Sequence, residues 1–200
     1  MQVLTLSPHE FDLHTAKLAR MVEEDDIGCF DAIVAIRRGG SFVCDSFCNH
    51  FAKDRYQERY DLTLQRPSTK RKSGLLGKLL KSLPLPILDK MRMVESALLE
   101  MRRKIKGPGR DPNVDVPVGL ANLLGKAISP KILIIDDAID SGDTLIAIVN
   151  SLTKLNPKSI LRIAVVTETT HSPRLHADYT LYRNRTLIRF PWSNDYKDKR

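Results

Sequence analysis

The sequence predicts an α/β protein with a mostly parallel, twisted sheet and flanking helices. Two observations predict this class. Short apolar runs alternate along the chain with segments whose apolar residues recur at helical spacing. The runs at 32–36 and 132–135 are apolar at every position, which is typical of parallel strands buried on both faces. The length of 200 residues fits one domain spanning 1–200.

Local signals place the elements in chain order. Ser7 followed by Pro8 predicts a helix start, because serine caps helix N-termini and proline is tolerated at the first helical position. The apolar run Ala32–Ile36 ends at Arg37-Arg38-Gly39-Gly40, as a buried strand does before a tight loop. The expected elements are a helix at about 8–22, a strand at 32–36, a helix at 41–51, strands at 60–64 and 132–135, a helix at about 144–155, and strands at 160–166 and 179–182.

Residues 66–113 do not follow this alternation, and we expect an insertion there. Its parts are a basic run (69–72), a cationic amphipathic segment (75–81), two prolines (84 and 86), an amphipathic helix (88–105) and a Gly-Pro-Gly end (107–109). This order predicts an inserted helical hairpin with a basic lead-in. A membrane-surface helix at 75–88 is the alternative, but the prolines favour an insert packed on protein or a dimer contact.

The charge balance favours anionic partners without choosing among them. The formal net charge is +8, with a sequence pI near 9.5. Phosphates, nucleic acid and acidic lipids would all suit this charge. The N-terminus lacks the charged start and apolar run of a signal peptide, and no stretch approaches the about 20 apolar residues of a membrane span. We therefore expect a cytoplasmic protein without a membrane span.

Three cysteines are too few for a disulfide framework and indicate a reducing compartment. Cys44 and Cys48 stand four residues apart, so a helix would place them on one face. With His50 nearby, a metal site is one interpretation. A pair that faces the core is the favoured one.

The most informative segment is Ile132–Leu145, which reads Ile-Leu-Ile-Ile-Asp-Asp-Ala-Ile-Asp-Ser-Gly-Asp-Thr-Leu. In an open α/β sheet, ligands bind outside the carboxyl ends of the strands, where these carboxylates lie. Backbone N–H groups, the helix dipole and the hydroxyls of Ser141 and Thr144 would form an anion cradle, and Gly142 permits close approach. Carboxylates beside a phosphate would repel it unless Mg²⁺ or ribose hydroxyls intervene. The alternative is a solvated acidic turn.

This pattern resembles the signature with which type I phosphoribosyltransferases bind phosphoribosyl pyrophosphate (PRPP), and the likeness extends over most of the chain outside the insertion. The resemblance implies the type I fold and roles for single residues. Asp136 and Asp137 would hold the ribose hydroxyls, directly or through Mg²⁺ and water. Asp140 would be the catalytic residue, placed near the base to assist proton transfer and to stabilise positive charge. The 5′-phosphate would be held, chiefly through backbone N–H groups, by Ser141, Gly142, Asp143 and Thr144, with the Asp143 carboxylate turned away.

A second match lies at the loop after the first expected strand. Arg37, Arg38 and Gly39 resemble the pyrophosphate loop of the xanthine- and hypoxanthine-type members, with Arg38 as the matching arginine. The resemblance implies a cis peptide between Arg37 and Arg38, because members often have a non-proline cis bond there. Taken alone, the loop could equally be a basic turn.

The end of the chain gives a third match. His176-Ala177-Asp178-Tyr179 and Phe190-Pro191-Trp192 resemble the close of the purine-type enzymes, so a small hood is expected at about 171–196. Trp192 is the candidate for stacking on the base, and the other interpretation is that it plugs the end of the core.

One departure concerns the base. Enzymes for 6-oxopurines usually present a lysine after the strand at 160–166, where this chain has Thr167-Glu168-Thr169-Thr170. We expect a Mg²⁺-dependent enzyme that transfers the phosphoribosyl group of PRPP to a nitrogenous base, purine-like by preference, and that forms a homodimer. The basic run at 68–72 would close over PRPP. The alternative is a non-catalytic regulator on the same fold that senses PRPP or a nucleotide and binds nucleic acid.

Overall fold

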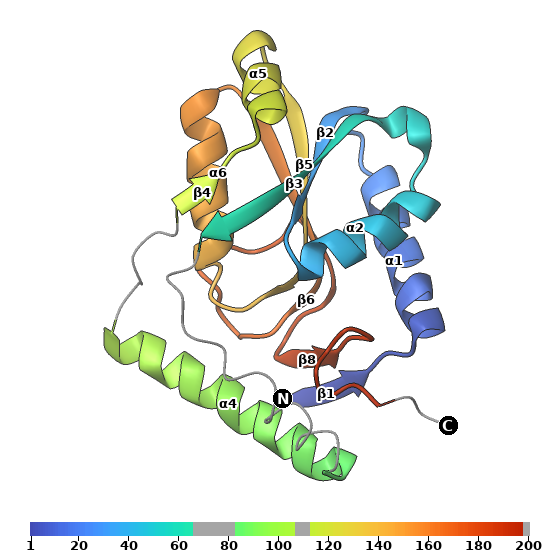
Figure 1. Cartoon of the computed structure of the whole chain (residues 1–200), viewed down its shortest axis with the longest axis vertical. Helices are drawn as coiled ribbons and strands as arrows, with labels where there is room; N and C mark the ends of the chain where they lie inside the picture. The colour runs from blue at the N-terminus through green and yellow to red at the C-terminus, as the bar shows by residue number, and fades with distance from the viewer. Residues whose placement is uncertain (66–82, 107–112, 198–200) are drawn as a thin grey trace.

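A six-stranded sheet of order β4-β3-β2-β5-β6-β7 forms the centre of the molecule (Figure 1). This computed structural model describes residues 1–65, 83–106 and 113–197. Neighbouring strands run parallel, except that β4 is antiparallel to β3. The strands are β2 (Phe30–Ile36), β3 (Tyr56–Gln65), β4 (Asn113–Asp115), β5 (Lys131–Ile139), β6 (Ile160–Glu168) and β7 (Tyr179–Tyr182). The predicted mostly parallel α/β sheet is confirmed.

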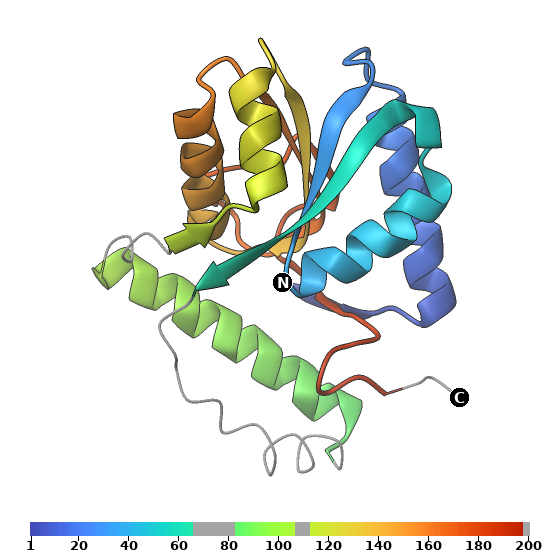
Figure 2. The same cartoon turned by 45° about the horizontal axis from the view of Figure 1, so that its top comes forward.

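Helices cover both faces of this sheet (Figure 2). One face packs against α1 (Pro8–Glu23) and α2 (Gly39–His50), and a short 3₁₀ turn η1 (Lys53–Arg55) leads into β3. The other face packs against α5 (Val118–Lys126) and α6 (Asp143–Leu155). Because successive strand residues point to opposite faces, every residue of an apolar run can be buried between the two helical layers.

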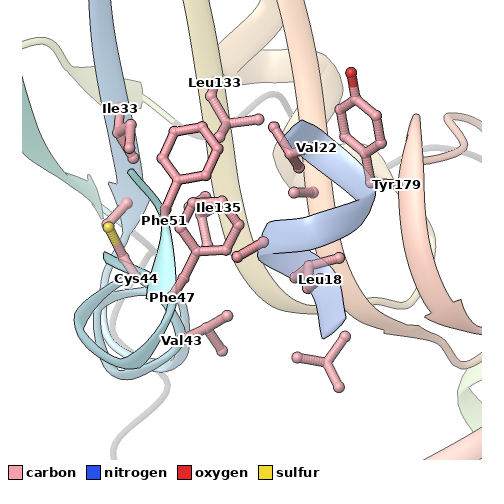
Figure 3. Close-up of a cluster of buried hydrophobic side chains, with 14 of the residues drawn as sticks. Leu18, Val22, Ile33, Val43, Cys44, Phe47, Phe51, Leu133, Ile135 and Tyr179 are labelled. Carbon is pink, nitrogen blue, oxygen red and sulfur yellow. The ribbon is translucent and has the colours of Figure 1, made fainter. Parts of the chain in front are cut away.

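Strand β5 shows how the two cores form. Leu133 and Ile135 lie in one buried cluster with Leu18 of α1 and Phe47 of α2 (Figure 3). The residues between them, Ile132 and Ile134, lie in the second cluster with residues of α5 and α6. The central strands therefore hold their carboxyl ends in fixed positions, and these ends carry the predicted motifs.

The first helix begins as its sequence predicts. The Glu10 backbone N–H donates to the Ser7 hydroxyl at 3.2 Å, and the Ser7 N–H donates to the Glu10 carboxylate at 2.7 Å. This reciprocal pair is a capping box, which satisfies two backbone donors that the helix itself leaves without partners.

A second, two-stranded sheet joins the chain ends. Strand β1 (Gln2–Thr5) pairs in parallel with β8 (Thr186–Arg189). The segment predicted as a hood at 171–196 is thus divided: β7 is the edge strand of the main sheet, and β8 joins the small sheet. We call β1 and β8 the hood sheet.

Helix α4 (Leu85–Lys106) crosses one end of the molecule beside the hood sheet (Figures 1 and 2). Its contacts centre on Arg189, a β8 residue that is only 1% exposed. The Arg189 guanidinium donates to Asp89 of α4, to Thr5 of β1 and to Asp195, at 2.7, 2.7 and 3.0 Å. Arg92 of α4 donates to the same Asp195 carboxylate at 2.8 Å. Charged groups with matched partners therefore fix α4 on the hood sheet.

Of the predicted hairpin, α4 corresponds to the second helix, while the predicted first helix at 75–81 and the basic run at 69–72 lie outside the described residues. None of the helices in the described ranges is both long and apolar enough to cross a membrane. Cys44 lies in a buried cluster with its sulfur 3.8 Å from that of Cys48, as the core interpretation predicts. Among the described residues, no group of three or more His, Cys, Asp or Glu could hold a metal ion.

Candidate functional site

The two predicted motifs follow the two strands at the centre of the sheet. From β2 the chain continues to β3 on one side, and from β5 it continues to β6 and β7 on the other side. Strands β2 and β5 are therefore neighbours at the point where the order of the sheet reverses. Such a point leaves a crevice at the carboxyl ends of the strands, because the following segments diverge to opposite faces. Helix α2 after β2 and helix α6 after β5 do cover opposite faces.

The loop after β2 brings two exposed arginines to this end of the sheet. The Arg37–Arg38 peptide is cis, as the family resemblance implies. The Arg37 N–H donates to the Leu62 carbonyl of β3 at 2.9 Å, and its side chain lies 3.8 Å from the Asp61 carboxylate. Both arginine side chains are exposed, and Arg38 stands at the N-cap of α2. Forked donors at a helix N-terminus suit the oxygens of a pyrophosphate.

Gly39 and Gly40 press this loop against the end of β5. A Cβ atom on Gly39 would lie 1.9 Å from the Asp137 carboxylate oxygen Oδ2. A Cβ atom on Gly40 would lie 2.5 Å from the Ile135 carbonyl oxygen. Only residues without a side chain allow this approach, so the two glycines join the predicted pyrophosphate loop to the predicted ribose carboxylates.

Asp136 and Asp137 form an acidic pair at the end of β5. The Asp137 backbone N–H donates to the Asp136 carboxylate at 2.9 Å. Burial raises the pKa of the Asp137 carboxyl, an effect that the hydrogen bond to Asp136 opposes and the charge of Asp140 reinforces. A cation or hydroxyl donors would offset this accumulation of negative charge. Carboxylate oxygens are hard ligands, and the pair therefore fits Mg²⁺ chemically.

Asp140 lies at the tip of the motif and is exposed. Two threonines of the segment after β6 hold it. The Thr169 hydroxyl donates to the Asp140 carboxylate, and the Thr170 hydroxyl donates to its backbone carbonyl at 2.6 Å. The carboxylate is thus oriented while it remains accessible from solvent.

The loop Ser141–Thr144 turns into the N-terminus of α6. Gly142 has a φ of 82°, a left-handed conformation that favours glycine, and its missing Cβ would lie 2.8 Å from the Leu175 backbone nitrogen. The Asp143 N–H donates to the Ser141 hydroxyl at 3.2 Å, and Thr144 is half-buried in the first turn. A turn of this kind directs backbone N–H groups toward one point, as anion sites at helix N-termini require.

The Asp143 carboxylate pairs with the Arg174 guanidinium at 2.7 Å. The Arg174 backbone N–H also donates to the Ser141 carbonyl at 2.8 Å. The Asp143 charge is therefore compensated by a cation, as a phosphate site would need. The sequence linked neither Arg174 nor the two threonines to this motif, because these residues lie about 30 positions from the residues that they contact.

Glu168 occupies the stretch where 6-oxopurine enzymes present a lysine. Its side chain is 2% exposed. The carboxylate accepts from the Ala177 N–H at 3.0 Å and from His176 at 2.9 Å, and it lies 3.7 Å from Arg183. These contacts make Glu168 the anchor of the segment that carries Arg174 and Leu175.

Trp192 is packed among aromatic side chains. Its ring stacks on Phe190 and on Phe42, with centroid distances of 4.7 and 4.8 Å, and meets Phe11 edge-on at 5.0 Å. This environment favours the interpretation that Trp192 closes the end of the core. The stacking role on a base stays a prediction.

Comparisons with known proteins identify the family and the fold. A family model described as phosphoribosyl transferase domain matches residues 7–199. A comparison with the sequences of curated proteins finds no match.

Solved structures show the same fold at low identity. The chain resembles a purine phosphoribosyltransferase from Pyrococcus horikoshii Ot3, with a TM-score of 0.59, 18% identity and coverage of 96% of this chain and 95% of that one. It also resembles a Helicobacter pylori xanthine-guanine-hypoxanthine phosphoribosyltransferase, with a TM-score of 0.60, 18% identity and coverage of 96% of this chain and 94% of that one. A third similar structure is a hypothetical protein from Neisseria gonorrhoeae with bound ppGpp, with a TM-score of 0.54, 14% identity and coverage of 96% of this chain and 89% of that one.

Proposed function

The chain belongs to the phosphoribosyl transferase domain family, and we propose that it transfers the 5-phosphoribosyl group of PRPP to a nitrogenous base and releases pyrophosphate. One observation carries this proposal. The glycines of the Arg37–Gly40 loop touch the end of β5, which brings a forked cationic loop and the N-terminus of α2 against the acidic pair, and the turn into α6 follows the same strand. PRPP has three matching parts: a pyrophosphate, a ribose with free hydroxyls and a 5′-phosphate.

Each part of PRPP then has its own group of residues. Arg37, Arg38 and the Gly39 backbone would hold the pyrophosphate. The turn 141–144 at the start of α6 would hold the 5′-phosphate through its N–H groups. Asp136 and Asp137 would accept hydrogen bonds from the ribose hydroxyls and would hold Mg²⁺, partly through water. When bound, Mg²⁺ would supply positive charge that neutralises the departing pyrophosphate.

The proposed reaction replaces one bond at C1 of the ribose. A base nitrogen forms the new bond to C1 as the bond from C1 to the pyrophosphate oxygen breaks, and the electron pair leaves with pyrophosphate. The transition state resembles an oxocarbenium ion, as in glycoside chemistry. Asp140, oriented by Thr169, would take the proton that the base nitrogen loses and stabilise the positive charge. Arg38 would stabilise the leaving group.

The acceptor base is purine-like in this proposal. Two of the similar structures are those of purine-type phosphoribosyltransferases. Glu168 and its neighbouring threonines stand where the lysine of 6-oxopurine enzymes is expected, and Glu168 is already engaged with His176 and Ala177. We therefore expect a base that is recognised without that lysine.

The direct test is a base panel. The protein is incubated with PRPP, Mg²⁺ and, in turn, purines, pyrimidines and related heterocycles, while pyrophosphate release is followed and the nucleotide product is identified by chromatography. We expect release with at least one base, and release that is slower by about 10²-fold or more with Asp140→Asn. No release with any base, despite measurable PRPP binding, would overturn the proposed activity.

A regulator that binds PRPP or a nucleotide without turnover is the second candidate. The similar neisserial structure holds ppGpp, a nucleotide with two phosphate groups on each side of its ribose. The net charge of +8 would also suit nucleic acid. The accessible, oriented Asp140 favours the enzyme, because a sensor has less need of a carboxylate at the reacting base.

For either function we propose the cytoplasm, where the free cysteines Cys29, Cys44 and Cys48 would stay reduced.

A further inference from the structure

Helix α4 presents a row of large apolar side chains on the side away from the hood sheet. Each of the five is between 46% and 59% exposed. They are Ile87, Met91, Val94, Leu98 and Met101, which we call the α4 stripe. At 3.6 residues per turn they lie within an arc of about 80°, and they extend for about 21 Å along the helix.

The opposite side of α4 is fixed to the protein body. Leu88 is 1% exposed, and Arg92 donates to Asp195 and to the Ile188 carbonyl. Glu100 pairs with Arg185 of the turn before β8. The helix is therefore folded and oriented before anything binds the stripe. A partner would not have to supply the free energy of helix formation, which is what limits short isolated helices.

The spacing of the α4 stripe is that of a coiled-coil seam. The steps between its residues are four, three, four and three, which places Met91 and Leu98 at heptad position a and the other three at position d. A seam confined to a and d is narrower than the apolar face of a helix that only covers a core. The stripe also lacks the Trp and Phe that membrane-surface helices commonly insert.

We propose that the α4 stripe is a self-association surface, on which a second copy of this chain packs its own α4 in parallel orientation. The residues beside the stripe carry complementary charges in that orientation. Exposed Lys90 stands at position g and exposed Glu95 at position e. In a parallel pair, a g residue faces the e residue five positions later on the other helix, so Lys90 meets Glu95 of the partner subunit twice. An antiparallel pair would instead place the two Glu95 carboxylates together.

The available surface is sufficient for a specific but modest interface. Five half-exposed side chains amount to a few hundred Å² on each copy, at the upper end of what monomers expose. With the flanking residues, two copies would bury about 1,000 Å² in total, which is the threshold for a biological interface and lies in the range of weak ones.

Light scattering of the full chain at micromolar concentrations tests this surface, independently of any activity. We expect about twice the chain mass of 22.6 kDa for the unchanged protein, and the mass of one chain for the double variant Val94→Glu, Leu98→Glu. Ile128→Glu is the control, because Ile128 is 83% exposed beyond the end of α5, at the other end of the molecule from α4 (Figure 1). Because glutamate is a good helix former, we expect the double variant to keep its fold, and an unchanged melting temperature would show this.

Charge exchange tests the parallel orientation. Lys90→Glu and Glu95→Lys should each weaken the dimer several-fold, and combining them should restore its affinity, because the exchanged charges again face their opposites. A mass of four chains would also support the surface if the double variant Val94→Glu, Leu98→Glu abolishes it. β-branched residues at position d suit coiled coils of four helices. A monomer, an oligomer indifferent to the double variant, or a monomer that binds vesicles of phosphatidylserine through the stripe would each overturn the proposal.

Discussion

Gly39 is the residue on which the contact between the two site loops depends. Because Gly39 has no side chain, the Arg37–Gly40 loop can lie against Asp137. A Cβ atom at this position would lie only 1.9 Å from the Asp137 carboxylate oxygen Oδ2. We expect Gly39→Ala to weaken PRPP binding by more than tenfold, because the methyl group must displace either the loop or the carboxylate. Isothermal titration measures this affinity.

The chain offers a matched control for this substitution. Gly125 lies in α5 with nothing within 4 Å of its Cβ position, so Gly125→Ala should leave PRPP affinity unchanged. Gly125 lies in the last turn of α5, so alanine should change the stability of this helix little. Equal PRPP affinities for Gly39→Ala and the unchanged protein would show that the loop contact is not part of the PRPP site.

Asp140 should act on the rate rather than on PRPP binding. It is exposed, and it stands between the acidic pair and the turn at 141–144 rather than in either of them. We expect Asp140→Asn to reduce turnover by about 10²-fold or more, as for loss of a general acid–base group, while PRPP affinity stays within a few-fold. Thr169→Val removes the hydrogen bond that orients the carboxylate, together with the hydroxyl's 3.3 Å bond to the Ile139 carbonyl, but keeps the carboxylate itself, so its loss of rate should be smaller. If rate and PRPP affinity fall together in Asp140→Asn, this residue belongs to the binding site instead.

The elements with strong periodicity are those that the sequence predicts. The strand at 132–135 and the helix at 144–155 are present within a few residues of their expected ends, and β7 has the expected bounds. Strand β5 continues to Ile139 through the two aspartates, because pairing with β6 holds polar residues in the extended conformation. Strands β1, β4 and β8 have three or four residues each, too few to show a period, and α5 lacks a polar cap. The parts of the site that need distant contacts, such as Arg174 beside Asp143, are likewise invisible to local patterns.

The junction between α4 and the hood sheet should make stability depend on pH. Burial opposes ionisation of the Asp195 carboxyl, but the hydrogen bonds and charges of Arg92 and Arg189 outweigh it and lower its pKa from 3.8 to about 2. A carboxyl with a lowered folded-state pKa stabilises the fold above its unfolded value, and this contribution is lost as the pH falls through the folded value. We expect about 2 kcal/mol from Asp195 at neutral pH, lost between about pH 4 and pH 2.

Other carboxyls titrate in the same range, so the measurement is a difference. Urea unfolding of the unchanged protein and of Asp195→Asn gives the free energy of unfolding of each at several pH values. The difference between the two proteins should be constant above about pH 5 and should shrink as the pH falls toward 2. A difference that does not change with pH would mean that Asp195 acts by packing or neutral hydrogen bonds rather than by its charge.

For the whole molecule, the sheet divides the tasks of the proposed site between its two halves. Strands β2 and β3 carry the loop proposed for pyrophosphate, while β5 and β6 carry the residues proposed for ribose, 5′-phosphate and base. A ligand that contacts both halves stabilises the folded state by an amount that grows with its concentration. The family match covers residues 7–199 and therefore includes both halves of the sheet.

The net charge of +8 could serve either function, and the two functions differ in what the basic residues bind. Lys70, Arg71 and Lys72 lie outside the described residues, so this prediction depends on the sequence alone. Changing all three to Gln should slow turnover or raise the PRPP requirement, because the basic run is expected to close over PRPP. The control changes Lys126, Lys154 and Lys158, three exposed lysines on α5, on α6 and just after α6, and lowers the net charge equally. Nucleic-acid binding, followed by fluorescence anisotropy, should be weak, steeply salt-dependent and unaffected by PRPP in every variant. Tight, sequence-preferring binding that PRPP modulates, with no turnover on any base, would instead identify a regulator.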